Sequence, residues 1–292
     1  MKKFEKVYEE VIKKDSQKFV SQRKLLYTLI VIMCIIGINL IVAVTLEIES
    51  VAINAGAIFL ILLLILIISL TKEYTKKYKE QVIFKFLKQI NETFKIYPEK
   101  SIDKKEYEKS GFKSGNQITS NDLIEGKLEN NLKVQMADIR VRDKRVNEAG
   151  EQTILTLFSG LFVVVELNKS IEKPIKLLAD QKKLGKRNLK IDHTEFEKHY
   201  DIFSENSLQA YQLYTADIMD KILEFKSKNK IYPEIIVNKN KLYIRIAVDG
   251  LFEPTLFDFG FDKETLKKYY EIIKLINEIS NHLLNTILDE IL

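Results

Sequence analysis

The chain has 292 residues, of which 46% are hydrophobic and 30% are charged, and its formal net charge is +5. These averages are typical of a folded protein and exclude a disordered or collagen-like chain. The single cysteine excludes a disulfide framework and a zinc site built from several thiolates, and three histidines argue against a multi-histidine metal centre. We therefore expect no metal ion and no other cofactor.

Two long segments near the N-terminus carry no charge. Residues 25–46 and 50–71 contain no Asp, Glu, Lys, Arg or His, and about 22 residues at about 1.5 Å each cross a hydrocarbon core of about 30 Å. Soluble helices seldom run this long without a polar face. The first segment is also too long for the apolar part of a signal peptide, and a second one follows at once. The sequence therefore predicts a retained transmembrane hairpin over residues 25–71.

The cations on either side of this hairpin predict its orientation. Residues 1–24 hold eight Lys or Arg and four Asp or Glu, and residues 72–90 hold six and two, whereas the connecting loop carries only Glu47 and Glu49. The positive-inside rule then gives a cell-membrane protein with two spans and both termini in the cytoplasm. The rest of the chain is close to neutral, which argues against a general nucleic-acid surface.

Small and amide side chains within the spans are candidates for helix–helix contact. An amide in hydrocarbon needs a hydrogen-bonding partner, which Asn39 and Asn54 would find within the hairpin, in a second protomer or along a pore. Ala52 and Gly56 lie four residues apart, a spacing that lets another helix approach closely. Through such contacts, these four residues are compatible with a homo-oligomer.

Amphipathic stripes flank the hairpin. The tail, residues 1–24, is expected to pack on the stalk or to rest at the lipid surface. The stalk, residues 72–98, is expected to complete one helix that runs from about Val51 to Tyr97, about 70 Å long, before Pro98 ends it. The tail shows a short apolar stripe: Phe4, Val7, Tyr8, Val11 and Ile12.

Residues 99–292 predict a cytoplasmic α+β domain with mainly antiparallel strands and a C-terminal helix. Residues 101–130 are polar and are expected to be loop with one or two helical turns. A change in alternation between Met136 and Ile139 suggests a bulge or a bend, and Gly160 is expected to kink a central strand. Strands are expected at 132–142, 153–167, 175–178, 189–191, 235–237 and 242–247, and helices at 194–198, 207–213, 217–225 and 263–291.

The chemical motifs are weak. His193 and His199 are six apart, so they do not share a helix face as the two histidines of a zinc helix do. Ser159 lacks the glycines of a nucleophile elbow, and no glycine-rich phosphate loop occurs. The sequence thus predicts neither catalytic residues nor metal ligands.

Two basic clusters are candidates for contact with anionic lipid headgroups, since each cation near such a surface contributes about 1 kcal/mol. Solvated hairpin tips remain the default interpretation of both. The polar segment 143–152 is expected to be the turn beside the first cluster. The clusters are Arg140, Arg142, Lys144 and Arg145, and Lys182, Lys183, Lys186 and Arg187.

Several short motifs, in order, resemble a bacterial family known as domain of unknown function 3137. They are Phe158-Ser159-Gly160-Leu161-Phe162, Glu195-Phe196-Glu197-Lys198, Tyr200-Asp201-Ile202, Ala210 with Leu213 and Thr215 before Met219, Leu242-Tyr243-Ile244, and Phe252-Glu253-Pro254. The resemblance covers about Tyr74 to Pro254 and implies two membrane helices ahead of the domain. Ala216 departs from it, where the family pattern has Pro. The resemblance implies no activity.

The sequence favours a non-enzymatic, membrane-tethered module whose cytoplasmic domain binds a partner protein or the inner leaflet. An enzyme acting on a membrane-proximal substrate is the first alternative, with Asp192, Glu195 and Glu253 converging in a pocket. A component of a small oligomeric channel or transporter is the second, and it depends only on Asn39 and Asn54.

Overall fold

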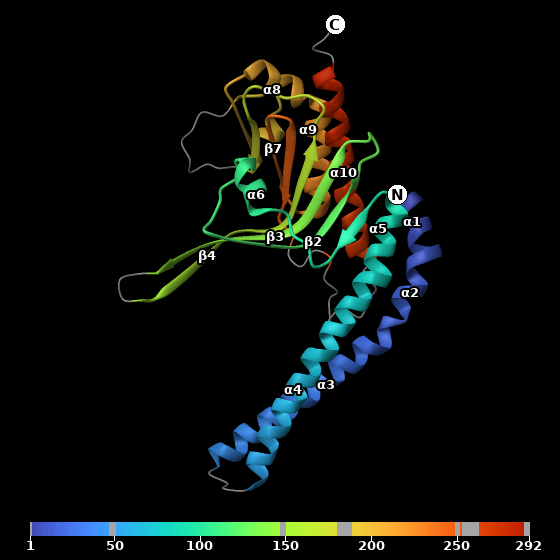
Figure 1. Cartoon of the computed structure of the whole chain (residues 1–292), viewed down its shortest axis with the longest axis vertical. Coiled ribbons are helices and arrows are strands. Elements are labelled where there is room, and N and C mark those ends of the chain that lie inside the picture. The colour runs from blue at the N-terminus through green and yellow to red at the C-terminus, as the bar shows by residue number, and fades with distance from the viewer. Residues whose placement is uncertain are drawn as a thin grey trace. The chain divides into compact units, whose positions relative to one another are not determined.

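The computed structural model describes residues 2–46, 51–146, 150–179, 189–248, 252 and 263–288 (Figure 1). The chain divides into two compact units. The helical unit comprises residues 1–90 and 252–267, and the α+β unit comprises residues 91–251 and 268–292. The helix α10 (Lys263–Leu288) contributes to both. The fold is α+β, as predicted.

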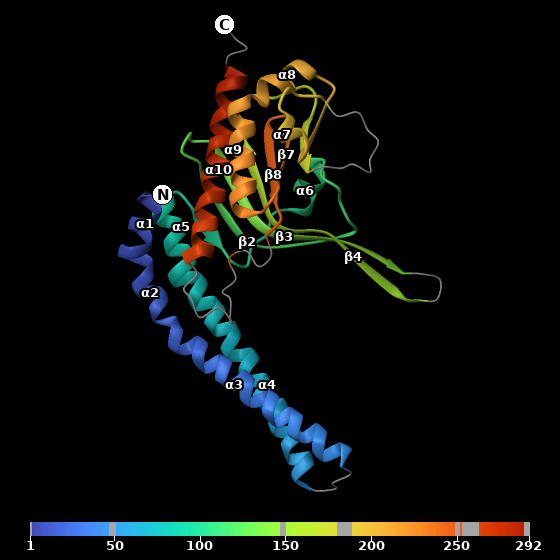
Figure 2. The same ribbon diagram turned by 180° about the vertical axis from the view of Figure 1, so that it is seen from behind.

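The helical unit is built from two long antiparallel helical stretches. The first stretch contains α1 (Lys2–Val7), the π-helical turn η1 (Tyr8–Ile12), α2 (Lys13–Gln17) and α3 (Phe19–Thr45). The second contains α4 (Val51–Tyr78), the π-helical turn η2 (Lys79–Ile83) and α5 (Phe84–Ile90). The helices α3 and α4 lie side by side in both views (Figures 1 and 2).

The N-terminal tail packs on the second stretch, which is one of its two predicted positions. Phe4 lies edge-on to Phe86, with 6.1 Å between ring centroids, and both rings are fully buried. Phe19 contacts Tyr78 in the same way at 5.5 Å. The Lys85 ammonium lies 2.6 Å from the Asp15 carboxylate. The apolar stripe of the tail is therefore part of the core of this unit.

The stalk helix ends earlier than the sequence predicts. It stops at Ile90, and residues Lys95–Tyr97 form the strand β1. The Asn91 side chain accepts hydrogen bonds from the Thr93 amide and hydroxyl and donates one to the Lys127 carbonyl. These contacts, together with the pairing of β1 to β2, hold the chain outside a helix, so Pro98 does not set the helix end.

The α+β unit contains one antiparallel eight-stranded sheet in the order β1-β2-β3-β4-β8-β7-β5-β6. All neighbouring pairs are antiparallel, as predicted. The strands after β1 are β2 (Gln117–Lys127), β3 (Lys133–Val146), β4 (Gln152–Glu166), β5 (Ile175–Ala179), β6 (Tyr200–Ser204), β7 (Pro233–Asn238) and β8 (Lys241–Ile246).

Helices of this unit pack on the two faces of the sheet. The helix α6 (Lys104–Ser110) lies on one face, and α9 (Ala216–Asn229) and α10 lie on the other (Figure 2). Tyr107 of α6 belongs to a buried cluster with Phe162 and Tyr243 of the sheet. The two short helices are α7 (Thr194–Glu197) and α8 (Ser207–Leu213).

Coverage of the two faces explains the change in alternation along β3. Val134 and Met136 are buried on the face of α9 and α10, whereas Ala137, Ile139 and Val141 are buried in the α6 cluster. The strand β3 pairs with β4 without a register shift at these residues. The predicted bulge is therefore not in β3. It lies in the neighbouring strand β2, between Asn121 and Ile124.

Gly160 lies at a close approach of two strands. Its φ is +147°, in the region that favours glycine. A Cβ atom there would collide with the Ile246 carbonyl oxygen and would lie 2.6 Å from the Val248 nitrogen. The long strand β4 can pair with β8 at this point because residue 160 has no side chain.

The remaining elements follow the predictions in part. The predicted helices in residues 194–225 correspond to α7, α8 and α9, and the predicted 235–247 hairpin to β7 and β8. The strand predicted at 189–191 is reduced to one bridge, between Leu189 and Ile202. The one or two helical turns predicted in 101–130 correspond to α6, but the loop predicted around them is wrong in part, because residues Gln117–Lys127 form β2.

Candidate functional site

The apolar surface of α3 and α4 is the largest unusual feature of the helical unit. Both helices are long and apolar enough to cross a membrane. Only 6% of the most apolar window of α3, and 11% of that in the second stretch, is buried. Large apolar side chains are exposed along both helices, among them Ile35, Ile38, Ile41, Ile58, Leu62 and Ile65. A core helix of a soluble protein would bury such side chains, because burial of apolar surface drives folding in water.

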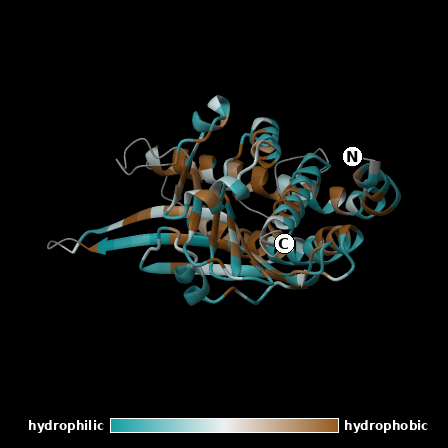
Figure 3. Cartoon of the chain, turned by 90° about the horizontal axis from the view of Figure 1, so that it is seen from above, coloured by the Kyte–Doolittle hydropathy of each residue, from teal (hydrophilic) through white to brown (hydrophobic). Residues whose placement is uncertain are grey.

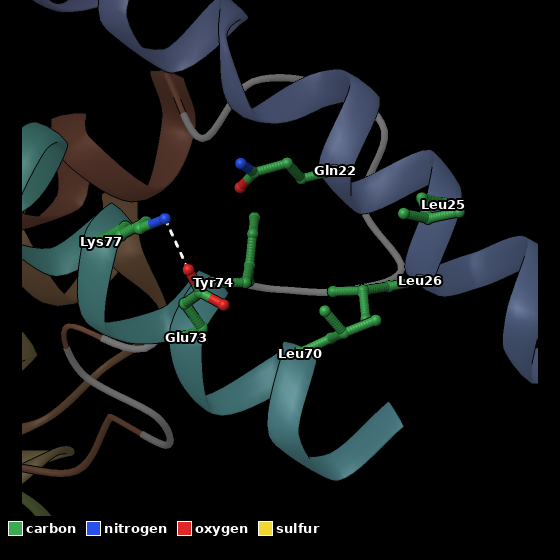
Figure 4. Close-up of a pocket in the computed structure, with 7 residues that line it drawn as sticks. All are labelled: Gln22, Leu25, Leu26, Leu70, Glu73, Tyr74 and Lys77. Carbon is green, nitrogen blue, oxygen red and sulfur yellow. Dashed lines mark hydrogen bonds and ion pairs between the residues drawn. The ribbon is translucent and has the colours of Figure 1, made fainter. Parts of the chain in front are cut away.

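The contact between the two helices becomes polar where the uncharged segments end. Arg23 is buried, and its Nε donates a hydrogen bond to the Tyr74 hydroxyl at 3.0 Å. Close by, a cavity of about 180 Å³ opens between α3 and α4 (Figure 4). Its lining combines apolar and charged side chains, with an ion pair of 2.6 Å between Lys77 and Glu73. The lining residues are Gln22, Leu25, Leu26, Leu70, Glu73, Tyr74 and Lys77.

The candidate helix–helix residues have different surroundings. Asn39 is exposed, and its amide donates to the Ile35 carbonyl at 2.7 Å, so it is satisfied within its own helix. Asn54 is also exposed. Gly56 lies against α3, because a Cβ there would come within 2.9 Å of the Leu40 side chain. The Ala52 side chain lies outside the described part of the chain.

The first basic cluster lies on a β-ribbon, not on a loop. We call the outer part of the β3–β4 pair, residues 140–146 and 152–159, the ribbon. It extends away from the rest of the α+β unit (Figures 1 and 2). The predicted polar turn 143–152 is shorter than expected, because β3 continues to Val146 and β4 begins at Gln152. Residues 147–149 lie outside the described residues.

The register of the ribbon separates its cations. Arg140, Arg142 and Lys144 alternate along β3 and so share one face, on which Ile154 pairs with Lys144. Arg145 lies on the opposite face and forms an ion pair of 2.8 Å with Asp143. In Figure 3, hydrophilic colour follows one strand of the ribbon and hydrophobic segments occur along the other. The second basic cluster, Lys182, Lys183, Lys186 and Arg187, lies outside the described residues.

Exposed apolar side chains on the ribbon are a feature that the sequence did not reveal. Ile154 and Leu155 are each 53% exposed, and Val146 is 59% exposed. The sequence placed residues 153–167 in a central strand, where both side chains would be buried. The only available signal was the cationic strand opposite, since a central strand in a buried sheet seldom pairs with four cations.

Of the carboxylates and histidines that were considered for chemistry, Glu195 and His199 are in contact, with 3.2 Å between the carboxylate and the ring nitrogen. Asp192 and Glu195 are exposed, and Glu195 pairs with Lys198 at 2.8 Å, which lowers its pKa. Glu253 lies outside the described residues. The ring of His193 accepts a hydrogen bond from the Phe196 amide and so caps α7. Within the described ranges, no three His, Cys, Asp or Glu side chains are grouped as metal ligands.

A buried polar network was also missed by the sequence reasoning. Arg245 of β8 pairs with Glu234 of β7 and donates to the Tyr107 hydroxyl at 3.4 Å. Its guanidinium also lies 4.5 Å from the centre of the Phe112 ring. Burial disfavours the charge of Arg245, but the Glu234 carboxylate outweighs it and raises the Arg245 pKa. The Tyr107 hydroxyl also donates to the Lys113 carbonyl, and Glu234 also accepts from the Ala179 amide. These polar groups are satisfied inside the unit, which indicates a structural role.

Comparison with known proteins identifies the α+β unit more closely. Residues 156–284 match the family model described as "Protein of unknown function (DUF3137)". The chain resembles that family, as the motifs predicted. The match begins later and ends later than the predicted range of Tyr74 to Pro254. It therefore excludes the ribbon's β3 strand and includes most of α10.

The other comparisons add little to the DUF3137 match. No curated protein matches the chain. The crystal structure of the mycobacterial trehalose monomycolate transport factor A, TtfA, has 8% sequence identity and a TM-score of 0.36. That similarity covers 64% of this chain and 88% of the other. A score this low carries no argument about fold or function.

Proposed function

We propose that this protein is a non-enzymatic membrane-tethered module, in which α3 and α4 span the cell membrane and the α+β unit lies in the cytoplasm. The observation that carries the proposal is the exposure of uncharged apolar side chains along both helices. In water, an apolar surface of this extent would drive aggregation. In a bilayer the same side chains contact lipid, and every backbone group is satisfied within its own helix.

The flanking charges support the orientation. The cation-rich segments 1–24 and 72–90 both adjoin the helix ends that carry the Arg23–Tyr74 contact, whereas the connecting loop contributes only Glu47 and Glu49. Cations are retained on the cytoplasmic side. Both termini and the α+β unit are then cytoplasmic.

The ribbon is the part of the α+β unit best suited to contact the inner leaflet. Its face with Arg140, Arg142 and Lys144 combines cations with the exposed side chains of Ile154 and Val146. Cations near an anionic surface contribute about 1 kcal/mol each, and apolar side chains add burial in the interface. The second basic cluster belongs to the same proposal from its sequence alone. A protein partner at this face is the alternative.

Extraction with alkaline carbonate tests the tether. The full chain is expected to stay in the membrane pellet, and quantitative release into the supernatant would contradict the proposal.

A fluorescent probe tests the leaflet contact. In a Cys34→Ala background, an environment-sensitive dye is attached to Ile154→Cys and, as a matched control, to Leu208→Cys, an exposed position on α8. In vesicles of neutral lipid supplemented with phosphatidylglycerol, only the dye at position 154 is expected to shift to the blue. Equal spectra with and without the anionic lipid would contradict leaflet docking and leave the tether unaffected.

A further inference from the structure

The two outer edges of the ribbon are protected to different extents. Inside the sheet both strands have a second neighbour, because β2 pairs with β3 up to Arg142 and β8 pairs with β4 from Leu161. Beyond these residues each strand presents one edge of backbone N–H and C=O groups. Unpaired edges are templates for pairing with another strand, and proteins usually block them.

The edge of β3 is blocked. The Asn116 amide donates to the Lys144 carbonyl at 2.7 Å, and the Lys144 amide donates to the Asn116 side chain at 2.9 Å. The backbone at Gly115 lies so close to the Arg142 carbonyl that no Cβ would fit. Cations along this strand add repulsion against any basic neighbour. This edge has the usual devices that prevent strand addition.

The edge of β4 has none of these devices. Residues 152–159 contain no charge and no proline, and Thr, Ile, Leu and Phe account for most of them. Within the described part of the chain, no strand pairs with this edge. Ile154 and Leu155, at its centre, are the exposed apolar side chains of the ribbon. An uncharged segment with high β-propensity is the type of strand that pairs readily with a copy of itself.

We propose that residues 152–159 of β4 pair, antiparallel, with the same segment of a second copy of this chain. The product is a four-stranded ribbon in the order β3–β4–β4–β3, closed by a two-fold axis. An additional strand at an exposed sheet edge gains main-chain hydrogen bonds along its length.

Charge favours a second copy as the occupant. The new pairing joins two uncharged segments, so no like charges oppose each other across it. The cationic β3 strands lie on the outside, separated by three strand spacings or about 14 Å. This exceeds the Debye length of about 8 Å at physiological ionic strength, so their repulsion is largely screened.

The size of the contact limits its strength in solution. One pair of eight-residue strands falls well short of the roughly 800 Å² per partner that stable complexes bury. The proposal therefore rests on the proposed membrane tether, because two copies held in one bilayer have a high effective concentration. The tether supplies only this concentration, because all residues that form the pairing site belong to β4.

Cysteine cross-linking of the full chain in membranes tests the pairing. In the Cys34→Ala background, single cysteines replace Thr153, Ile154 or Leu155 on β4, and Lys144 or Arg145 on β3 serves as the matched control. A disulfide requires Cα atoms within about 7 Å, so under mild oxidation we expect a dimer of twice the chain mass from at least one β4 cysteine. The β3 cysteines are expected to give at least about tenfold less, because they lie about 14 Å apart.

A second variant separates pairing from folding. Leu155→Lys adds a charge to the edge and is expected to abolish the cross-link formed by the cysteine at position 153 or 154, while the thermal midpoint of the protein is unchanged. Cross-linking at β3 equal to that at β4, no cross-link from any β4 cysteine, or an adduct with a different protein would each overturn the proposal. Carbonate extraction of the same samples reports on the tether separately, so its failure is distinguishable from failure of the pairing.

Discussion

Ile38 in α3 and Ile244 in β8 have the same side chain in opposite surroundings. Ile38 is 62% exposed, whereas Ile244 is fully buried. The contrast extends to their units: α3 and α4 expose apolar side chains along their length, whereas the sheet, apart from the ribbon, buries its apolar side chains under α6, α9 and α10. Both units also enclose charged side chains, Arg23 in the helical unit and the Arg245–Glu234 pair in the α+β unit. The packing of the sheet is thus suited to water, whereas the exposed apolar surface of α3 and α4 is suited to lipid.

The largest expected effect comes from charges placed on the exposed surface of α3. Ile35→Lys with Ile38→Lys costs about 5–7 kcal/mol if both positions face hydrocarbon, at about 2.5–3.5 kcal/mol for each. We expect the variant to lose carbonate resistance, while the control with Leu at both positions keeps it. If these positions face water, the same change is nearly neutral, and a double-Lys variant that is retained like the control would break the comparison.

Removal of a buried cation is expected to have the next largest effect. Arg245→Met leaves the Glu234 carboxylate buried without its partner, which costs about 3–5 kcal/mol of unfolding free energy. Denaturant unfolding of the full chain in mild detergent measures the loss. Adding Glu234→Gln is expected to recover part of it, and Lys104→Met, which removes an exposed ion pair, should cost less than about 1 kcal/mol. Equal losses of unfolding free energy for Arg245→Met and Lys104→Met would show that the Arg245–Glu234 pair contributes no more than an exposed ion pair.

Two glycines sharpen the comparison of packing. Gly160→Ala forces a side chain into the β4–β8 contact at an unfavourable φ, which costs about 1–3 kcal/mol from backbone strain alone. Gly37→Ala in α3 meets no atom within 4 Å, and helix propensity favours Ala by about 1 kcal/mol. We expect a lower thermal midpoint for the first variant and an unchanged or higher one for the second. The opposite order would contradict the packing described for β4.

The smallest effect is a pH dependence within the helical unit. Hydrogen bonds from Lys18 and Lys85 hold the pKa of Asp15 below its usual value. The stabilisation is therefore present above the ordinary pKa of about 4 and is lost as pH falls through the lower pKa of the folded state. The protection factors of the amides in residues 3–17, each taken relative to the intrinsic exchange rate at the same pH, should fall by up to about fivefold on acidification, the range of an exposed ion pair.

The Asp15→Asn variant is the control for this prediction. Its protection factors in residues 3–17 should already be lower at neutral pH and should change less on acidification. A tail whose protection has the same pH dependence in both proteins would show that the Asp15–Lys85 contact does not hold it.

The sequence predicted those elements whose hydrophobic pattern is set by one environment along their whole length. The uncharged runs of α3 and α4, the stripe of α10 and the alternation of β8 each follow from one solvent or one buried face. The strand β2 was missed because its bulge at Asp122 interrupts the alternation. The strand β1 was missed because its three residues depend on pairing with β2, a contact that no local pattern records.

The candidate site was predictable only in its composition. The cations of the ribbon were identified by type, but their separation onto two faces depends on register with β4. The exposure of Ile154 depends on where β8 stops, about 90 residues later in the chain. The Arg245–Glu234 pair likewise depends on the β7–β8 register, which the alternation of the two strands suggests. The contact of Arg245 with Tyr107 of α6 has no such signal in the sequence.

Labelling with a membrane-impermeant maleimide tests the central claim most directly. In the Cys34→Ala background, single cysteines replace Glu49 in the connecting loop and Lys104 at the start of α6. In intact cells, the reagent is expected to label position 49 and to reach position 104 only after the membrane is permeabilised. Labelling of position 104 from outside, or equal labelling of both positions without permeabilisation, would contradict a two-span anchor with a cytoplasmic α+β unit.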